Sequence, residues 1–126
     1  MTERSGTRFY PGRAPIDAYG DGGFRFAGMS HRGSLLILPS GMHAWSPAAM
    51  DEIELDSFAP AFAEPEAIGL LLFGTGRTQV FPAVDIRHAF ATRAITLEAM
   101  DTGAAVRTYN VLLAEGRAVA AALIAI

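Results

Sequence analysis

The fold is decided by the apolar run Ala67-Ile-Gly-Leu-Leu-Leu-Phe73, which is closed by the glycine-rich turn Gly74-Thr-Gly76. A continuous apolar run of this length between turn residues is typical of a strand that is buried on both faces. Two further strands are predicted downstream, over Ala94–Met100 and Val119–Ile126. Because a helical stretch separates each strand from the next, the three strands should pair in parallel through right-handed crossovers.

The two predicted crossover helices differ in their boundary signals. The first should begin near Pro82, a residue favoured in the first helical turn, and run to about Thr92. The second should take Thr102 as its N-cap and run to Glu115. Gly116 then suits the left-handed residue that often ends a helix. These signals place an α/β unit in the C-terminal half of the chain.

The chain before Ala67 has the pattern of antiparallel β-structure. Strands are predicted over Ile16–Tyr19, Phe24–Ala27, Ser34–Pro39 and His43–Trp45, with a turn over Gly28–Gly33. Asp56 should cap a short helix over Ser57–Ala63. The predicted fold is therefore α/β, a parallel sheet with crossover helices and an N-terminal antiparallel region. Residues 1–13 are predicted to be a flexible arm, and residues 14–126 a single domain.

Composition narrows the functional classes. The 126-residue chain has a net charge of −3, which argues against nucleic-acid binding because such binding neutralises several phosphates. It contains neither cysteine nor lysine, so thiolate and Schiff-base chemistry are excluded. The longest apolar run, Val119–Ile126, is far shorter than a membrane helix requires. We expect a cytoplasmic protein without membrane insertion, and its 51% hydrophobic content leaves room for a homodimer.

The second crossover helix carries an unusual set of polar residues. They are Arg107, Thr108, Tyr109 and Asn110, followed by Glu115 and Arg117 at the helix end. A buried polar group without a partner costs about 1–3 kcal/mol, so these residues need partners. They form either an internal hydrogen-bond network or a surface that recognises another molecule. Val106, Tyr109 and Leu113 form the face that should pack on the sheet.

Several arrangements of these polar residues remain open. Asn110 is the only asparagine and lies mid-helix, where its propensity is poor, so a specific hydrogen-bonding task is expected. Arg107 and Glu115 can form an ion pair. Alternatively, Arg107 and Arg117 can hold a carboxylate or phosphate between two guanidinium groups. The first arrangement is structural, whereas the second is a ligand site.

The turn Gly74-Thr75-Gly76 is a second candidate site. It follows a buried strand, where open α/β sheets usually bind ligands, and its backbone N–H groups can cradle an anion. Together with Thr102 it would form one side of an anionic-ligand site that extends to Asn110. The alternative is a sharp turn in which both glycines adopt positive φ.

The sequence supports no metal or cofactor site. His31, His43 and His88 are scattered, without metal-ligand spacing. No serine lies in a Gly-x-Ser-x-Gly motif, so a hydrolase triad has no local support. We therefore predict no metal, no cofactor and no catalytic residues.

With these residues in view, the chain resembles a known family. The resemblance rests on three segments: the strand ending in Gly74-Thr-Gly76, Met100-Asp-Thr-Gly-Ala-Ala-Val-Arg-Thr-Tyr-Asn-Val-Leu112 and Glu115-Gly-Arg-Ala-Val-Ala-Ala-Ala-Leu123. They resemble a family of small domains of unknown function that includes the mitochondrial NADH:ubiquinone oxidoreductase (complex I) assembly factor 3. The likeness covers about residues 14–124, and this chain resembles a bacterial member. Val106 stands where many members have cysteine.

The resemblance implies a three-layer β/β/α fold with a β-hammerhead-like hairpin region. It also implies a non-enzymatic protein-interaction module, an assembly factor for a respiratory or membrane complex, whose partners are proteins such as respiratory-complex subunits. The alternative, which comes from the residues, is a binding protein or enzyme for a small anionic ligand. Its site would lie between the Gly74–Gly76 loop and the start of the Thr102–Asn110 segment.

Overall fold

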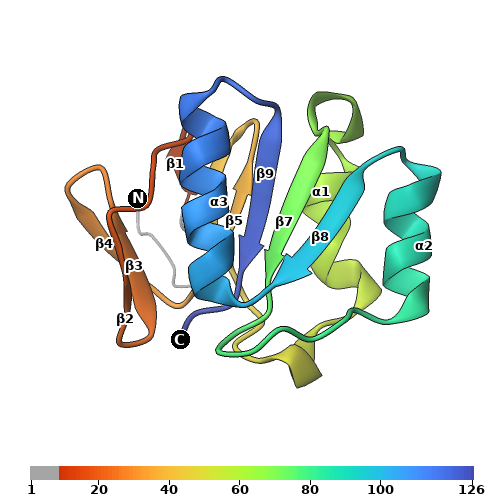
Figure 1. The fold of residues 1–126 in the computed structure, drawn as a ribbon, viewed down its shortest axis with the longest axis horizontal. Helices are drawn as coiled ribbons and strands as arrows, with labels where there is room; N and C mark the ends of the chain where they lie inside the picture. Colours follow the sequence, from red (N-terminus) through yellow and green to blue (C-terminus); the bar gives the residue numbers. More distant parts are fainter. Residues whose placement is uncertain (1–8) are drawn as a thin grey trace, which may run out of the picture.

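The computed structural model describes residues 9–126, which form a mixed six-stranded sheet with a small second sheet beside it (Figure 1). The strand order of the large sheet is β1-β6-β5-β9-β7-β8. Its strands are β1 (Phe9–Pro11), β5 (Ser34–Leu38), β6 (Gly41–Trp45), β7 (Leu70–Gly74), β8 (Thr96–Met100) and β9 (Val119–Leu123). The predicted α/β fold class is confirmed.

The parallel part of the sheet comes from the C-terminal half of the chain, as predicted. β7 lies between β8 and β9 and is parallel to both. The crossover helices are α2 (Val84–Thr92) and α3 (Thr102–Ala114). Pro82 was predicted to lie in the first turn of α2. The N-cap of α2 is Ala83, so Pro82 instead precedes the helix. A proline ahead of a helix start restricts the entering chain without removing a helical N–H.

The N-terminal half extends the same sheet with antiparallel strands. β5 pairs with both β6 and β9, and so joins the two halves of the chain. β1 pairs with β6, with Phe9 opposite His43. Arg13 also donates a hydrogen bond to the carbonyl of Val119 over 2.9 Å. Residues 9–11 of the predicted 1–13 arm therefore pair with β6 in the sheet, and residues 1–8 lie outside the described residues.

The small sheet is a three-stranded antiparallel meander. Its strands are β2 (Ala18–Gly20), β3 (Gly23–Phe26) and β4 (Met29–Arg32). β4 occupies most of the segment predicted as a turn, Gly28–Gly33. The turn is instead the pair Ala27 and Gly28, with φ of 50° and 74°. A two-residue hairpin turn of type I′ needs positive φ at both positions, and alanine rarely adopts it, which is why the sequence did not reveal this hairpin.

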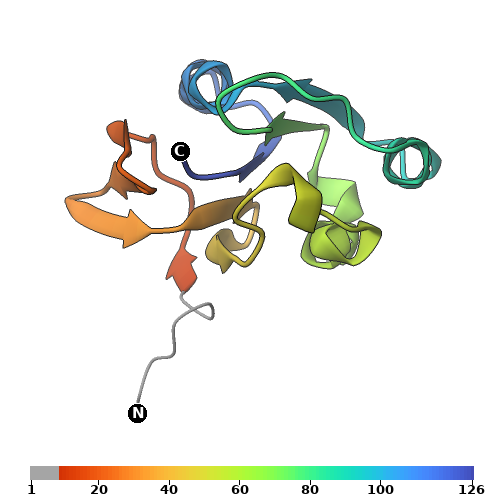
Figure 2. The same ribbon diagram turned by 90° about the horizontal axis from the view of Figure 1, so that it is seen from below.

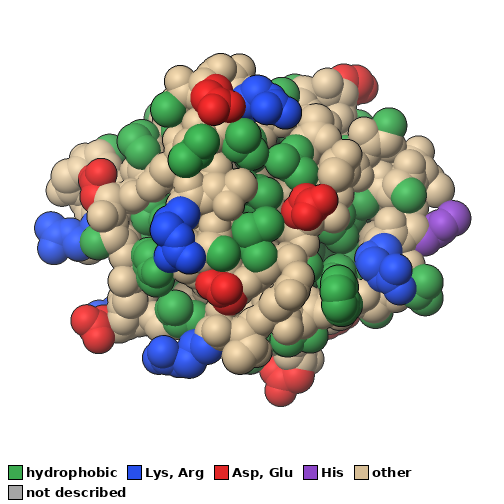
Figure 3. Space-filling view, viewed as in Figure 1, with side chains coloured by type: hydrophobic (Ala, Val, Ile, Leu, Met, Phe, Trp, Pro, Cys, Tyr) green, Lys and Arg blue, Asp and Glu red, His purple; other side chains and the backbone are tan. Residues whose placement is uncertain are grey.

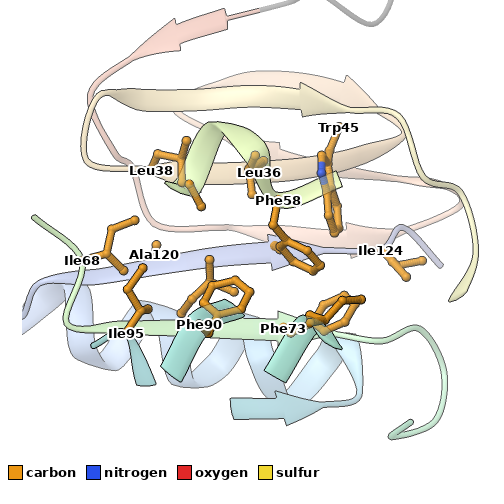
Figure 4. Packing of buried hydrophobic residues seen from close by; sticks show 14 residues of the cluster. Leu36, Leu38, Trp45, Phe58, Ile68, Phe73, Phe90, Ile95, Ala120 and Ile124 are labelled. Atoms are coloured by element: carbon orange, nitrogen blue, oxygen red, sulfur yellow. The ribbon is translucent and has the colours of Figure 1, made fainter. Parts of the chain in front are cut away.

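Each face of the large sheet carries its own hydrophobic cluster. On one face Phe58 is fully buried, with ring centroids 5.5 Å from Trp45, 5.3 Å from Phe73 and 5.2 Å from Phe90 (Figure 4). The short helix α1 (Ala59–Phe62) and α2 cover this face. α3 and β3 cover the other, so the molecule has three layers (Figure 2). Burial of these clusters is the main stabilising contribution, at roughly 25 cal/mol per Å² of apolar surface.

The segment before β7 departs from its prediction in detail. The predicted Ser57–Ala63 helix is divided into a 3-10 helix over Leu55–Phe58 and α1. Glu54, and not Asp56, is the N-cap, because its side chain and that of Ser57 form a reciprocal capping box.

His43 gives the stability of the fold a small pH dependence. Burial lowers the pKa of its imidazole below the ordinary 6.5, and the carboxylate of Glu64 partly opposes this shift. The unfolded chain therefore binds a proton that the folded chain does not, so stability is greatest above the unfolded pKa and falls as pH decreases toward the folded pKa. Urea unfolding at about pH 7.5 and about pH 5.5 should show this fall, reduced in His43→Gln. The exposed His88→Gln is the control; equal falls in all three proteins would contradict the assignment.

Candidate functional site

The Gly74–Gly76 loop lies where the carboxyl end of β7 meets the start of α3. The buried hydroxyl of Thr102 accepts a hydrogen bond from the N–H of Gly76 over 3.0 Å and donates to the carbonyl of Ile124 over 2.7 Å. The N–H of Thr102 in turn donates to the carbonyl of Gly76 over 2.8 Å. Thr102 thus ties together the loop, the helix start and the chain after β9.

Thr75 secures the other side of the same loop. Its N–H donates to the carbonyl of Met100 over 2.8 Å, and its hydroxyl donates to the carbonyl of Thr78 over 2.6 Å. The hydroxyl also accepts from the N–H of Val80 over 3.0 Å. The N–H groups of both Thr75 and Gly76 are therefore bound within the protein. These bonds occupy the amides that an anion cradle would need.

The two glycines of the loop are required for different reasons. Gly76 has φ of 107°, a conformation that favours glycine, as predicted. Gly74 does not have positive φ; a Cβ there would lie 3.0 Å from both Cα and Oγ1 of Thr102. Close packing of helix on strand therefore explains Gly74.

The start of α3 corrects the predicted cap. Asp101, and not Thr102, is the N-cap, and its carboxylate accepts from the N–H of Ala104 over 2.9 Å. Both residues are good caps and they are adjacent, so the sequence did not separate them. A carboxylate already occupies the positive end of the helix dipole, where an anionic ligand would have to bind.

Tyr109 and Asn110 hold an extended segment, residues 13–16, which we call the strap. The Tyr109 hydroxyl donates to the carbonyl of Ala14 over 2.8 Å. Asn110 accepts from the N–H of Ile16 over 2.8 Å and donates to its carbonyl over 2.9 Å, as a neighbouring strand would. Burial raises the pKa of Tyr109 well above its ordinary value, against the opposing charge of Arg13. For these two side chains the structure places the polar groups in an internal network.

The other polar residues of this region are accessible. Arg107 is exposed, and its guanidinium donates to the Tyr19 hydroxyl over 3.5 Å. Glu115 lies 3.9 Å from Arg117, and both side chains are exposed. Glu115 therefore lies beside Arg117, and the predicted ion pair between Arg107 and Glu115 is not formed. Arg117 lies beyond the end of α3, and its guanidinium is the group beside Glu115.

A groove of about 500 Å³ lies between α3 and the face of β8. Its apolar lining includes Leu70, Met100 and Leu112, and its polar lining includes Thr96, Glu98 and Arg117. Thr108, whose hydroxyl donates to the carbonyl of Ala104 over 2.9 Å, also lines it. On the face of the molecule with α3 and β8, hydrophobic side chains gather between acidic and basic ones (Figure 3).

The groove exists because no helix covers the edge of this sheet face. α3 packs mainly on β7 and β9 and leaves β8 beside it open. Thr96 and Glu98 are exposed on β8, whereas Leu97 packs against the cluster on the opposite face. Neither Thr96 nor Glu98 was predicted from the sequence to be a site residue. The signal that could have found them is the polar–apolar alternation of Thr96-Leu-Glu-Ala99, typical of a strand with one exposed face.

Three features of the site and the fold hold for residues 9–126, the part of the chain that the structure describes. No group of three or more His, Asp or Glu side chains is arranged to hold a metal ion within this range. None of its helices has the length and apolar character needed to cross a bilayer. Every buried side-chain nitrogen and oxygen in it has a hydrogen-bond partner. The hydrogen-bonding groups of Thr102 and Asn110 therefore have their partners within the protein.

Comparison with known proteins identifies the domain. Residues 16–124 match the family model described as "Protein of unknown function (DUF498/DUF598)". The chain belongs to the DUF498/DUF598 family. An uncharacterised protein of Rhodobacter capsulatus is 41% identical over 115 residues, which are 91% of this chain and 87% of that protein. This confirms the family that the sequence resembled.

Two further proteins that are similar to this chain are a human assembly factor and a bacterial protein of known structure. Human NADH dehydrogenase (ubiquinone) 1 alpha subcomplex assembly factor 3 is 34% identical over 110 residues, which are 86% of this chain. The chain spans 59% of the human protein's length. A crystal structure from Bartonella henselae, described as an outer membrane protein, has a TM-score of 0.89 and 47% identity, covering 92% of this chain and 98% of that chain. The matched family range contains both α3 and β8, so the groove belongs to the shared domain.

Proposed function

We propose that this DUF498/DUF598 protein is a non-enzymatic interaction module that acts in assembling a respiratory complex of the NADH dehydrogenase type. The groove between α3 and β8 is the observation that carries the proposal. It is an accessible surface whose lining contains both apolar and charged residues. The 34% identity to an assembly factor supports the choice of partner class. Its partners would be subunits of the complex or other proteins that handle them.

The chemistry of the groove suits a protein partner. Leu70, Met100 and Leu112 are only partly buried, so a partner that covered them would remove further apolar surface from water. Glu98 and Arg117 supply opposite charges within the groove, which can fix the orientation of the partner. An apolar centre with polar residues around it is the usual build of protein interfaces. The anionic-ligand alternative has no comparable observation, since the loop amides are bound internally.

The groove predicts which substitution removes the partner. Thr96 is exposed in the groove, so Thr96→Arg should fill it with a long charged side chain while costing less than about 0.5 kcal/mol of stability. Tagged protein purified from its host should capture respiratory-complex subunits, and the variant should capture at least about tenfold less, equivalent to a loss of ~1.4 kcal/mol. Thr92→Arg makes the same change at an exposed residue of α2, outside the groove. This variant should capture respiratory-complex subunits as well as wild type does.

Two results would count against this proposal. Wild-type protein that captures no respiratory-complex subunit, even after chemical cross-linking in the cell, would remove the proposed partner class. Equal capture by wild type and Thr96→Arg would remove the groove as the binding surface. A cytoplasmic location is part of the proposal, and cell fractionation tests it directly because the Bartonella relative is described as an outer membrane protein.

A further inference from the structure

We infer that the free edge of β8 receives an extended segment of the partner, and that this segment carries a basic residue opposite Glu98. The inference rests on the proposed function, because it specifies how the partner beside the groove is held. β8 is the last strand of the large sheet. Figures 1 and 2 show helix α2, and no further strand, on the outer side of β8. An extended segment would therefore continue the sheet by one strand.

The backbone of β8 determines which groups the edge offers. The N–H of Thr96 donates to the carbonyl of Gly69 over 3.1 Å, toward β7. Groups of alternate residues point the same way along a strand, so every second residue from Thr96 turns its N–H and C=O toward β7. Leu97 and Ala99 therefore turn theirs outward. These two residues supply the hydrogen-bonding groups of the edge.

One of the outward groups is already occupied. The side-chain amide of Gln79 donates to the carbonyl of Ala99 over 2.8 Å and closes the carboxyl end of the edge. The N–H and C=O of Leu97 and the N–H of Ala99 remain for a partner strand. Val80 and Phe81, which follow Gln79 in the chain, are 40% and 77% exposed and add apolar surface at the closed end. The edge therefore has a defined register, with Glu98 between the two residues that bind.

Glu98 decides what kind of chain can pair here. Its side chain is exposed on the groove side, and within residues 9–126 no cation forms an ion pair with it. A second copy pairing antiparallel about this position would place two Glu98 side chains directly opposite, with Cα atoms about 4.5 Å apart. Like charges in that position destabilise the pairing, whereas a basic residue stabilises it. The occupant that this charge favours is a different chain, with an extended, apolar segment that places a basic residue opposite Glu98.

A peptide selection with charge exchange tests the inference. A phage library of random linear peptides of about twelve residues would be selected on the immobilised full chain, and the best binders remade as synthetic peptides. We expect a basic residue at one fixed position, flanked by alternating apolar residues. Glu98→Lys should weaken these peptides by about tenfold or more, and selection on that variant should replace the basic residue with Asp or Glu. Glu66→Lys, the same charge change on an exposed residue outside the groove, should bind like wild type.

A second variant tests the backbone pairing itself. Ala99→Pro removes only an outward N–H, so it should keep the β7–β8 pairing while weakening peptide binding by about tenfold or more. Ala99→Val keeps that N–H and should bind like wild type. If Ala99→Pro does not fold, the charge exchange at Glu98 decides the question alone.

Failure of this inference can be told apart from failure of the proposed function. An absence of binders, binders without a basic position, or binders indifferent to both Glu98→Lys and a folded Ala99→Pro would overturn the edge pairing. If Thr96→Arg still abolished capture of respiratory subunits in that case, the proposed function would stand. If the wild-type protein captured none of these subunits, the function would fall whatever the peptides showed.

Discussion

Thr102→Val should lower the free energy of unfolding by about 2–6 kcal/mol. Valine has nearly the same shape as threonine, so the core keeps its volume and only the hydroxyl is lost. That hydroxyl is fully buried, accepting from the N–H of Gly76 and donating to the carbonyl of Ile124. Both backbone groups would remain buried without a partner, at about 1–3 kcal/mol each. Urea unfolding monitored by circular dichroism measures the change.

The matched control is Thr102→Ser. Serine keeps the hydroxyl and loses one methyl group, which should cost about 1 kcal/mol. The valine variant should therefore be clearly less stable than the serine variant. If serine proved the more damaging of the two, the hydroxyl would not be the group that holds the loop to α3.

Asn110→Ala should cost about 2–3 kcal/mol, because both hydrogen bonds to Ile16 are lost together. The loss should be local as well as global. Ile16 is 4% exposed, so its N–H should be protected from hydrogen exchange in the wild type and should exchange much faster in the variant. Urea unfolding and hydrogen-exchange mass spectrometry of the strap give the two readouts.

Thr108→Ala is the control for this prediction. The Thr108 hydroxyl bonds the carbonyl of Ala104 in its own helix, and alanine is the better helix former, so the change should be within about 0.5 kcal/mol. Strap protection should also stay as in the wild type. Equal effects of the two substitutions would show that Asn110 does not anchor the strap.

The polar residues of α3 and of the chain just after it fall into two groups. Thr102, Tyr109 and Asn110 act within the protein, fixing the loop and the strap. Thr108 and Arg117 line the groove and can meet a partner. Substitutions of the first kind should act through stability, whereas substitutions in the groove should act on partner binding in a protein of normal stability.

The sequence predicted the elements that depend on local pattern. β7 was visible as an apolar run closed by glycines, and a polar task for Asn110 followed from its place mid-helix. The partner of Asn110 was not predictable, because Ile16 lies 94 residues away and carries no signal of its own for this contact. β4 was missed because the hairpin turn uses Ala27 with positive φ. The groove was missed because it depends on which strands α3 covers, which is a property of tertiary packing.

The most direct test of the assembly role is the amount of assembled NADH dehydrogenase complex in a host strain that lacks this protein. Native gel electrophoresis of solubilised membranes, stained for NADH dehydrogenase activity, measures it. We predict that the complex is depleted in the deletion strain and restored by wild type and Thr92→Arg. Thr96→Arg, expressed at the same level, should not restore it. A normal amount of assembled complex in the deletion strain would contradict the account.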